Sequence, residues 1–189
     1  RIIEIAVLRV RQGEVAETFS TLVDPERPIP PHIEVLTGIR NEDLRGAPPF
    51  DNIKELLLDL FRDAVFVAHN ARFDYQFVRE EFRRHKVSFS APCLCTMRLS
   101  RRLFPEYRRH SLDALIDRFD IRCDSRHRAL GDASVLLHFL KEIENRTPPD
   151  QLQGVVGELL KTPTLPPLLD EKTLSSLPQS PGVYVFFGE

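Results

Sequence analysis

The chain has 189 residues, 42% of them hydrophobic, and is therefore long enough to bury a sizeable core. Its net charge of −2, and the lack of any apolar run near the roughly 20 residues that span a bilayer, give no overall sign of a nucleic-acid or membrane partner. The three cysteines lack the spacing of zinc ligands and are odd in number. We therefore expect them to be small buried residues in a reducing cytoplasm, and neither a disulfide framework nor a zinc site. We therefore expect a cytoplasmic protein with no membrane partner.

Two β-rich runs open the chain, from Ile2 to Val10 and from Val15 to Val23. The residues between them contain Gly13, which is typical of a hairpin turn. Three prolines between Asp24 and Pro31 then exclude regular structure, so the sequence predicts a loop with a short helix after the hairpin.

A helix is predicted next, with Asp51 as its N-cap and apolar residues at helical spacing up to Phe61. The apolar run from Ala64 to Ala68 suits a strand buried on both faces. Helical periodicity follows at once, which places Asp74 in the first turn of another helix.

The remaining elements are a short strand at residues 93–96, a basic helix to Leu103, a helix capped by Ser111, and a helix from Ala129 to Glu144. Between Arg98 and Arg128 the segment is net basic by four. Its arginines suit contacts with phosphates, although solvated surface arginines are the commoner outcome.

Two acids stand on apolar helix sides. Asp74 lies one turn from Phe77 and Val78, and Asp132 shares a helix face with apolar residues. His127 precedes Asp132 by five residues, so both reach one site only if His127 lies in the loop before the helix. Two carboxylates and a titratable histidine suit metal-assisted hydrolysis of a phosphodiester, whereas the alternatives are helix capping by Asp74 and a solvated His127.

The motifs that carry these residues resemble the DEDDh-type 3′–5′ exonucleases, a family that includes the epsilon-like proofreading subunit of bacterial replicative polymerases. LTGI, HNARFD, HSLDAL and HRALGD follow one another in the family's order within residues 1–144. The resemblance implies an α/β, ribonuclease H-like fold of three layers, in which helices flank a mixed central sheet.

The resemblance also implies the site residues. It assigns Asp74 and Asp132 as ligands of two divalent ions, Mg²⁺ or Mn²⁺, and His127 as general base. Substrate binding is assigned to the following residues: Leu36, Thr37, Gly38, Ile39 and Asn70.

One family motif is not found. The family's Asp-x-Glu, on its first strand, would precede the run IIEIAV, and this chain begins there. We therefore expect that the first strand is missing from this chain, that two strand edges lack partners, and that the 189-residue chain alone is inactive.

The last residues carry a weaker resemblance. LPQSPGVYVF is similar to the opening of a GIY-YIG nuclease domain of the kind found in excision-repair incision subunits. The sequence then divides into an exonuclease domain at residues 1–145, a Pro-rich and partly helical linker at 146–176, and the start of a truncated GIY-YIG-like domain at 177–189.

The function expected from the resemblance is metal-dependent 3′–5′ exonuclease action at single-stranded or frayed DNA 3′ ends, in replication or repair. A DNA polymerase or excision-repair proteins are the expected partners. Two alternatives stay open: a non-catalytic module that binds nucleic acid or a protein partner, and an exoribonuclease of the same family.

Overall fold

The computed structural model describes residues 1–123 and 125–161. No helix in these two ranges is long and apolar enough to cross a membrane. In chain order the elements are β1 (Glu4–Arg11), β2 (Glu14–Leu22), α1 (Pro31–Thr37), α2 (Phe50–Phe61), β3 (Phe66–Ala68), α3 (Arg72–Arg84), β4 (Cys93–Cys95), α4 (Thr96–Leu103), α5 (Leu112–Phe119), α6 (Ala129–Arg146) and α7 (Pro149–Lys161).

The predicted hairpin is confirmed. Strands β1 and β2 pair antiparallel, and the turn between them places Gln12 (φ 53°) and Gly13 (φ 78°) in the left-handed region. A two-residue turn with two positive φ angles matches the right-handed twist of the flanking strands, and glycine adopts such an angle without steric cost.

The predicted mixed sheet takes the form of two separate two-stranded sheets in the described residues. Strands β3 and β4 pair parallel, with Phe66 opposite Cys93, and hydrogen bonds join neither strand to β1 or β2. Each of β1 and β3 therefore has a strand partner on one side only within the described part of the chain.

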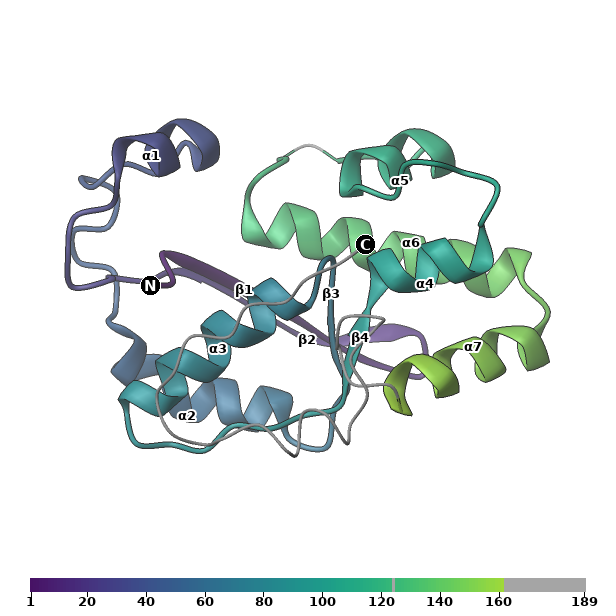
Figure 1. The fold of residues 1–189 in the computed structure, drawn as a ribbon. Coiled ribbons are helices and arrows are strands. Elements are labelled where there is room, and N and C mark those ends of the chain that lie inside the picture. Colours follow the sequence, from purple (N-terminus) through teal and green to yellow (C-terminus); the bar gives the residue numbers. More distant parts are fainter. Residues whose placement is uncertain (124, 162–189) are drawn as a thin grey trace, which may run out of the picture.

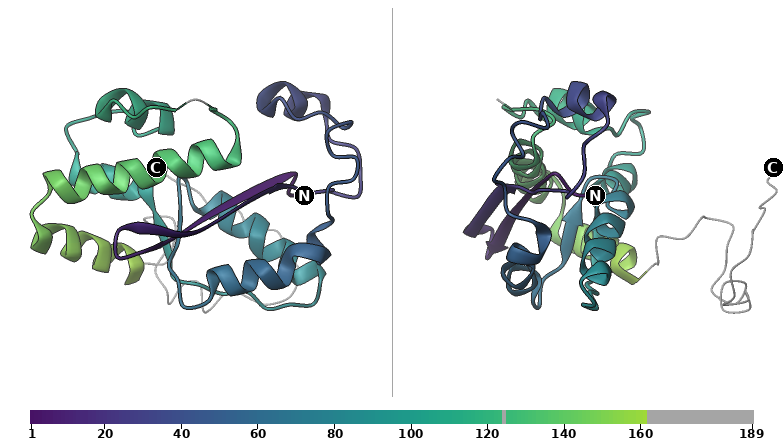
Figure 2. Two further views of the ribbon diagram at one scale, coloured as in Figure 1. Left: turned by 180° about the vertical axis from the view of Figure 1, so that it is seen from behind. Right: turned by 90° about the vertical axis from the view of Figure 1, so that its left-hand side faces the viewer.

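Helices cover these strands on two sides (Figure 1). Helices α2 and α3 pack with β1 and β2 around the fully buried Leu57 and Phe82. Helices α4 to α7 pack with β4 around Leu99 and Phe139, and α6 also runs along β1 (Figure 2). The apolar side of α7, including Leu159, thus belongs to the same core as α4.

Helix α2 does not begin as the sequence predicted. Asp51 was expected as the N-cap, but the helix starts at Phe50 after Pro49, whose backbone is extended (φ −66°, ψ 159°). Phe50 is buried, and its ring packs edge-on against Phe82 with 5.1 Å between centroids. Burial of this ring draws residue 50 into the helix, so Asp51 lies in the first turn and pairs with His85 at 3.0 Å.

Strand β1 also holds the far end of α2. The guanidinium of Arg9 donates to the carbonyl oxygens of Asp59 (2.7 Å), Leu60 (2.7 Å) and Arg62 (3.1 Å). These carbonyls lie at the C-terminus of α2, where helix geometry leaves acceptors without partners and the helix dipole favours a cation. Arg9 thus stabilises the helix end and fixes α2 against the hairpin.

Candidate active site

The chain turns sharply between β3 and α3, at the motif that carries Asp74. Asn70 has φ 58°, a left-handed conformation that asparagine tolerates better than most residues, and its carbonyl oxygen accepts from Phe73 N at 2.9 Å. Helix α3 begins at Arg72, so Asp74 lies in its first turn as predicted.

A buried hydroxyl ties this turn to the neighbouring strand. Thr96, which follows β4 and is fully buried, donates to Ala68 O at 3.2 Å and lies 3.0 Å from His69 Nδ1. Burial lowers the pKa of His69. These contacts fix the end of β3, from which the turn and Asp74 follow.

Asp74 itself stands without a compensating charge. Within residues 1–123 and 125–161 it has no ion pair and no side-chain hydrogen bond to another residue. The residue opens to solvent on one side, yet desolvation by the protein on its other side raises the pKa of its carboxyl to about 6. The negative charge of Asp132 makes a further, smaller contribution to this rise.

The second acid lies at the start of α6. Asp132 is in the first turn of that helix, and His127 lies two residues before its first residue, Ala129, with φ 63°. The condition that His127 lies in the loop before the helix is thus met. Its side chain is solvent-exposed.

Gly131 permits this turn to fold back on the helix. A Cβ atom placed on Gly131 would lie 2.1 Å from the carbonyl oxygen of Ser125, far inside contact distance. Any side chain at position 131 would therefore push the turn, with His127 in it, away from α6.

Asp132 is paired, unlike Asp74. The guanidinium of Arg126 contacts Asp132 Oδ1 at 2.5 Å and Asp113 Oδ1 at 2.7 Å, so it bridges α6 and α5. The arginine also holds the pKa of Asp113 below its usual value through a hydrogen bond. Sequence reasoning missed this bridge, because Arg126 was one of many arginines in a basic segment.

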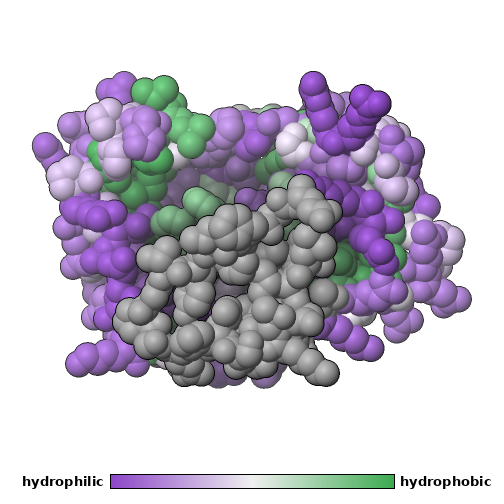
Figure 3. Space-filling model, in the orientation of Figure 1, coloured by the Kyte–Doolittle hydropathy of each residue, from purple (hydrophilic) through white to green (hydrophobic). Residues whose placement is uncertain are grey.

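The LTGI segment forms the end of α1. Leu36 is 57% exposed, whereas Ile39 is 2% exposed and packs with Ile29 and Leu44. Thr37 donates to Ile33 O at 2.8 Å, and Gly38 ends the helix with φ 71°. Figure 3 shows apolar side chains exposed over α1, which lies on the same side of the molecule as the start of α6 (Figure 1). Leu36 is thus available to a ligand, while Ile39 anchors the segment.

The basic segment is partly used within the fold. Arg118 lies over the Tyr107 ring at 3.7 Å from its centroid and donates to Arg109 O at 2.6 Å. Other arginines of this segment, including Arg108 and Arg122, are exposed and remain available for phosphate contacts.

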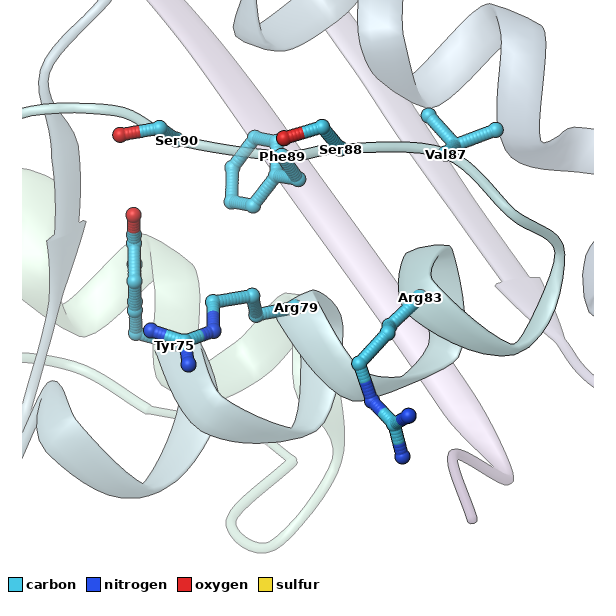
Figure 4. A pocket seen from close by; sticks show the side chains of 7 residues that line it. All are labelled: Tyr75, Arg79, Arg83, Val87, Ser88, Phe89 and Ser90. Carbon is cyan, nitrogen blue, oxygen red and sulfur yellow. The ribbon is translucent and has the colours of Figure 1, made fainter. Parts of the chain in front are cut away.

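A pocket of about 360 Å³ lies elsewhere on α3 (Figure 4). It is lined by Tyr75, Arg79 and Arg83 and by residues 87–90. Arg79 is five residues beyond Asp74, about 140° around the helix, so this pocket opens away from the two acids. It is not part of the candidate active site.

The two acids have the right chemistry for a hard divalent cation, which prefers carboxylate oxygen. A bound cation would offset the electrostatic repulsion between the two carboxylates and would pair with the carboxylate of Asp74. Across residues 1–123 and 125–161, however, no group of three or more His, Cys, Asp or Glu residues is arranged to hold a metal. The pair fits as part of a metal site and requires further ligands.

Comparison with known proteins decides the family. A family model described as Exonuclease (RNase_T) matches residues 1–140. The chain belongs to the exonuclease family. Members of this family are hydrolytic nucleases that generally depend on divalent metal ions.

Curated relatives of this exonuclease chain are polymerases. DNA polymerase III PolC-type of Streptococcus pyogenes is 34% identical over 150 residues, which cover 77% of this chain and 10% of that protein. The PolC-type polymerase of Latilactobacillus sakei is 36% identical over 144 residues, again 10% of its length. The chain thus spans about a tenth of the length of these relatives.

Solved structures confirm the predicted α/β, ribonuclease H-like fold of this exonuclease chain. Exonuclease X in complex with 5′ overhanging duplex DNA is 27% identical, with a TM-score of 0.60 over 82% of this chain and 91% of that one. Exonuclease I, at 18% identity, gives a TM-score of 0.70 over 80% of this chain and 38% of that one.

Proposed function

We propose that the protein is a metal-dependent 3′–5′ exonuclease that hydrolyses phosphodiester bonds at single-stranded or frayed DNA 3′ ends. The observation that carries the proposal is that Asp74 and Asp132 each lie in the first turn of a helix, with His127 on the turn before α6. The charge of Asp132 contributes to the raised pKa of Asp74, which supports a common site. The similarity to Exonuclease X, whose structure holds DNA, and to PolC-type polymerases supports DNA as the substrate.

In this proposal Asp74 and Asp132 hold two divalent ions, Mg²⁺ or Mn²⁺. Such ions would supply Lewis-acid stabilisation of the leaving oxygen and lower the pKa of a bound water. His127, exposed on the turn before α6, takes the proton of the attacking water as general base.

Substrate contacts come from three other places. Leu36, exposed at the end of α1, packs on the terminal base, and Thr37, Gly38 and Ile39 shape and anchor that segment. Asn70, at the turn before Asp74, offers an amide to the substrate. Exposed arginines of the basic segment hold backbone phosphates.

The metal set needs further acids. None of the four described strands carries an Asp-x-Glu pair. We propose that such a pair, on a strand that hydrogen-bonds to the open sides of β1 and β3, supplies the remaining ligands. The 189-residue chain alone is then inactive.

Nuclease assays on 3′- and 5′-labelled single-stranded DNA with Mg²⁺ test these proposals. The 189-residue chain is compared with a version extended at its N-terminus by the preceding residues of its gene. We expect release of nucleotides from the 3′ end by the extended version only. Degradation by the 189-residue chain would show that the site is not the one described, and an RNA strand of the same sequence tests the exoribonuclease alternative.

Variants assign the roles. His127→Ala should lower the rate by about 10²- to 10⁴-fold while leaving affinity for single-stranded DNA nearly unchanged. Asp150→Asn is the matched control for Asp74→Asn and Asp132→Asn, because Asp150 is also a first-turn acid but lies on α7. An equal loss of rate and affinity in His127→Ala would contradict the general-base role.

A non-catalytic binding module is the second candidate. The Arg126–Asp132 ion pair favours it, since an acid neutralised by arginine has no need of a metal. DNA binding by the extended version without cleavage in either Mg²⁺ or Mn²⁺ would support this candidate.

Association with a DNA polymerase is part of the proposal, on the basis of the PolC-type relatives. Excision-repair partners and a GIY-YIG-like domain were predicted from residues 177–189, which lie outside the described residues.

A further inference from the structure

The N-terminus of α6 is capped by a residue that lies 125 positions earlier in the chain. One carboxylate oxygen of Glu4, on β1, accepts from Arg128 Nε at 3.0 Å and Nη2 at 2.8 Å. Its other oxygen accepts from the backbone N–H of Ala129 at 2.8 Å. The Glu4 side chain is only 11% exposed and its bond to the Ala129 amide is partly buried, whereas Arg128 is 46% exposed and its two bonds to Glu4 face solvent.

Helix α6 has no cap of its own. Its N-cap residue, Arg128, makes no side-chain capping bond, and Ala129 N–H is one of the donors that helix geometry leaves unsatisfied. Glu4 supplies the acceptor, and its negative charge is favoured at a helix N-terminus. By contrast, Ser111 caps α5 from within the local sequence, where its hydroxyl accepts from Ala114 N at 3.3 Å.

We call the bonds of Glu4 to Arg128 and to the Ala129 amide the Glu4 clamp. This clamp acts on the two residues that directly follow His127. This histidine has φ 63°, which is unfavourable for a residue with a Cβ atom and persists only where the surroundings impose it. Glu4 fixes the side chain of residue 128 and the amide of residue 129, while Ser125 sits against Gly131 on the other side of the turn.

We infer that Glu4 is a positioning residue for His127: it acts through Arg128 and the Ala129 amide to hold the turn that presents the imidazole. This inference rests on the proposed function. Both carboxylate oxygens of Glu4 are occupied by α6, so Glu4 works as a part of the scaffold and not as a metal ligand.

Amide hydrogen exchange on the intact protein tests the clamp without any assay of activity. In Glu4→Ala, protection of the Ala129 amide should fall by about 10-fold or more, because its acceptor is gone. Glu14→Ala is the matched control: Glu14 also joins the hairpin to α6, through Lys141 at 3.1 Å, but is 82% exposed. Unchanged exchange at Ala129 in Glu4→Ala, or an equal change in Glu14→Ala, would overturn the inference.

Kinetics on the N-terminally extended version test the action on His127. Glu4→Ala should lower kcat by about 10- to 100-fold with little change in KM, since a small misplacement of a catalytic group has effects of this size. Glu4→Gln keeps an acceptor for Ala129 and should restore most of the rate. Arg128→Ala, which leaves the Ala129 bond in place, should fall between the two.

A double variant separates positioning from general damage. If Glu4 acts through the imidazole, Glu4→Ala causes no further loss in a His127→Ala background. Full additivity of the two losses would overturn the positioning role. Lack of activity in the N-terminally extended version without substitutions would overturn the proposed function and with it this role, whereas the exchange experiment judges the clamp independently.

Discussion

The two helix junctions that carry the acids are built alike and held differently. Each has a non-glycine residue with positive φ, Asn70 at 58° or His127 at 63°, and then a helix with an aspartate in its first turn. The β3–α3 junction is fixed by a neighbouring buried hydroxyl, that of Thr96. The α6 junction is fixed by charged side chains from β1 and α5.

The two junctions leave their aspartates in different electrostatic environments. Asp74 keeps its carboxyl free of ion pairs among the described residues, and its pKa is raised to about 6 as a result of desolvation and the charge of Asp132. Asp132 is instead neutralised by Arg126. A cation that binds both acids therefore gains from Asp74 but has to compete with an arginine at Asp132.

The largest expected effect concerns the close contact at the α6 junction. In Gly131→Ala the new Cβ would lie 2.1 Å from Ser125 O, so the turn with His127 must move. We expect the exonuclease rate to fall about 10²-fold, because a displacement near 1 Å of a catalytic group has this effect. Steady-state rates of the N-terminally extended version on a 3′-labelled strand measure it.

Gly154→Ala, on α7, is the control for that change. A Cβ at Gly154 meets nothing within 4 Å, so the rate should stay the same and stability should rise slightly through the better helix propensity of alanine. A normal rate in Gly131→Ala would show that the turn tolerates movement and that the α6 junction is not held tightly.

The next effect concerns the hydroxyl at the β3–α3 junction. Thr96→Val keeps the shape of the side chain but leaves Ala68 O and His69 without their buried partner. We expect a loss of about 1–3 kcal/mol in the free energy of unfolding, measured with urea. Thr18→Val, on the exposed part of β2, should change it little, and equal effects at the two sites would contradict the special role of Thr96.

A smaller effect concerns the charge of Asp74. Its pKa is raised from 3.8 to about 6, so the folded protein binds this proton more tightly than the unfolded chain does. The stability from this carboxyl is therefore present near pH 4 and is lost as the pH rises through about 6. Asp74→Asn removes that loss, so its stability relative to the unmodified protein should be more favourable at about pH 7 than at about pH 4.

Urea unfolding in the presence of EDTA at both pH values measures this difference. Solvent on the open side of Asp74 screens the charge, so the effect should be smaller than that of Thr96→Val. A relative stability that is the same at both pH values, or that changes in the opposite sense, would contradict the raised pKa.

The smallest effect concerns a helix capped by its own sequence. Ser111→Ala removes the acceptor for Ala114 N and should cost about 1 kcal/mol of unfolding free energy without a change in exonuclease rate. Ser134→Ala, at a half-buried position inside α6, is the control and should have a smaller effect, because its hydroxyl only donates to Leu130 O within the helix. A fall in rate in Ser111→Ala would show that α5 also positions the site, through Asp113 and Arg126.

Local sequence determined what could be predicted. The hairpin, the Ser111 cap and the first-turn positions of Asp74 and Asp132 follow from periodicity and capping rules that act over a few residues. The start of α2 was placed wrongly, because burial of Phe50 against Phe82 overrode the capping preference of Asp51.

Contacts between distant residues could not be predicted. Glu4 and Ala129 are 125 residues apart, and no periodic pattern in the sequence links a glutamate on the first strand to a helix so far along the chain. The Arg126 bridge was hidden for a similar reason, since its two acids lie on different helices.

Strand β1 carries an acid and a base that serve opposite ends of different helices. Glu4 reaches the N-terminus of α6, and Arg9 reaches the C-terminal carbonyls of α2. The two residues are five apart on a strand, so they point to opposite faces. A slip of one residue in strand register would exchange those faces and set each charge against the wrong helix dipole. The charges of β1 therefore select its register during folding, in addition to the selection made by its apolar side chains.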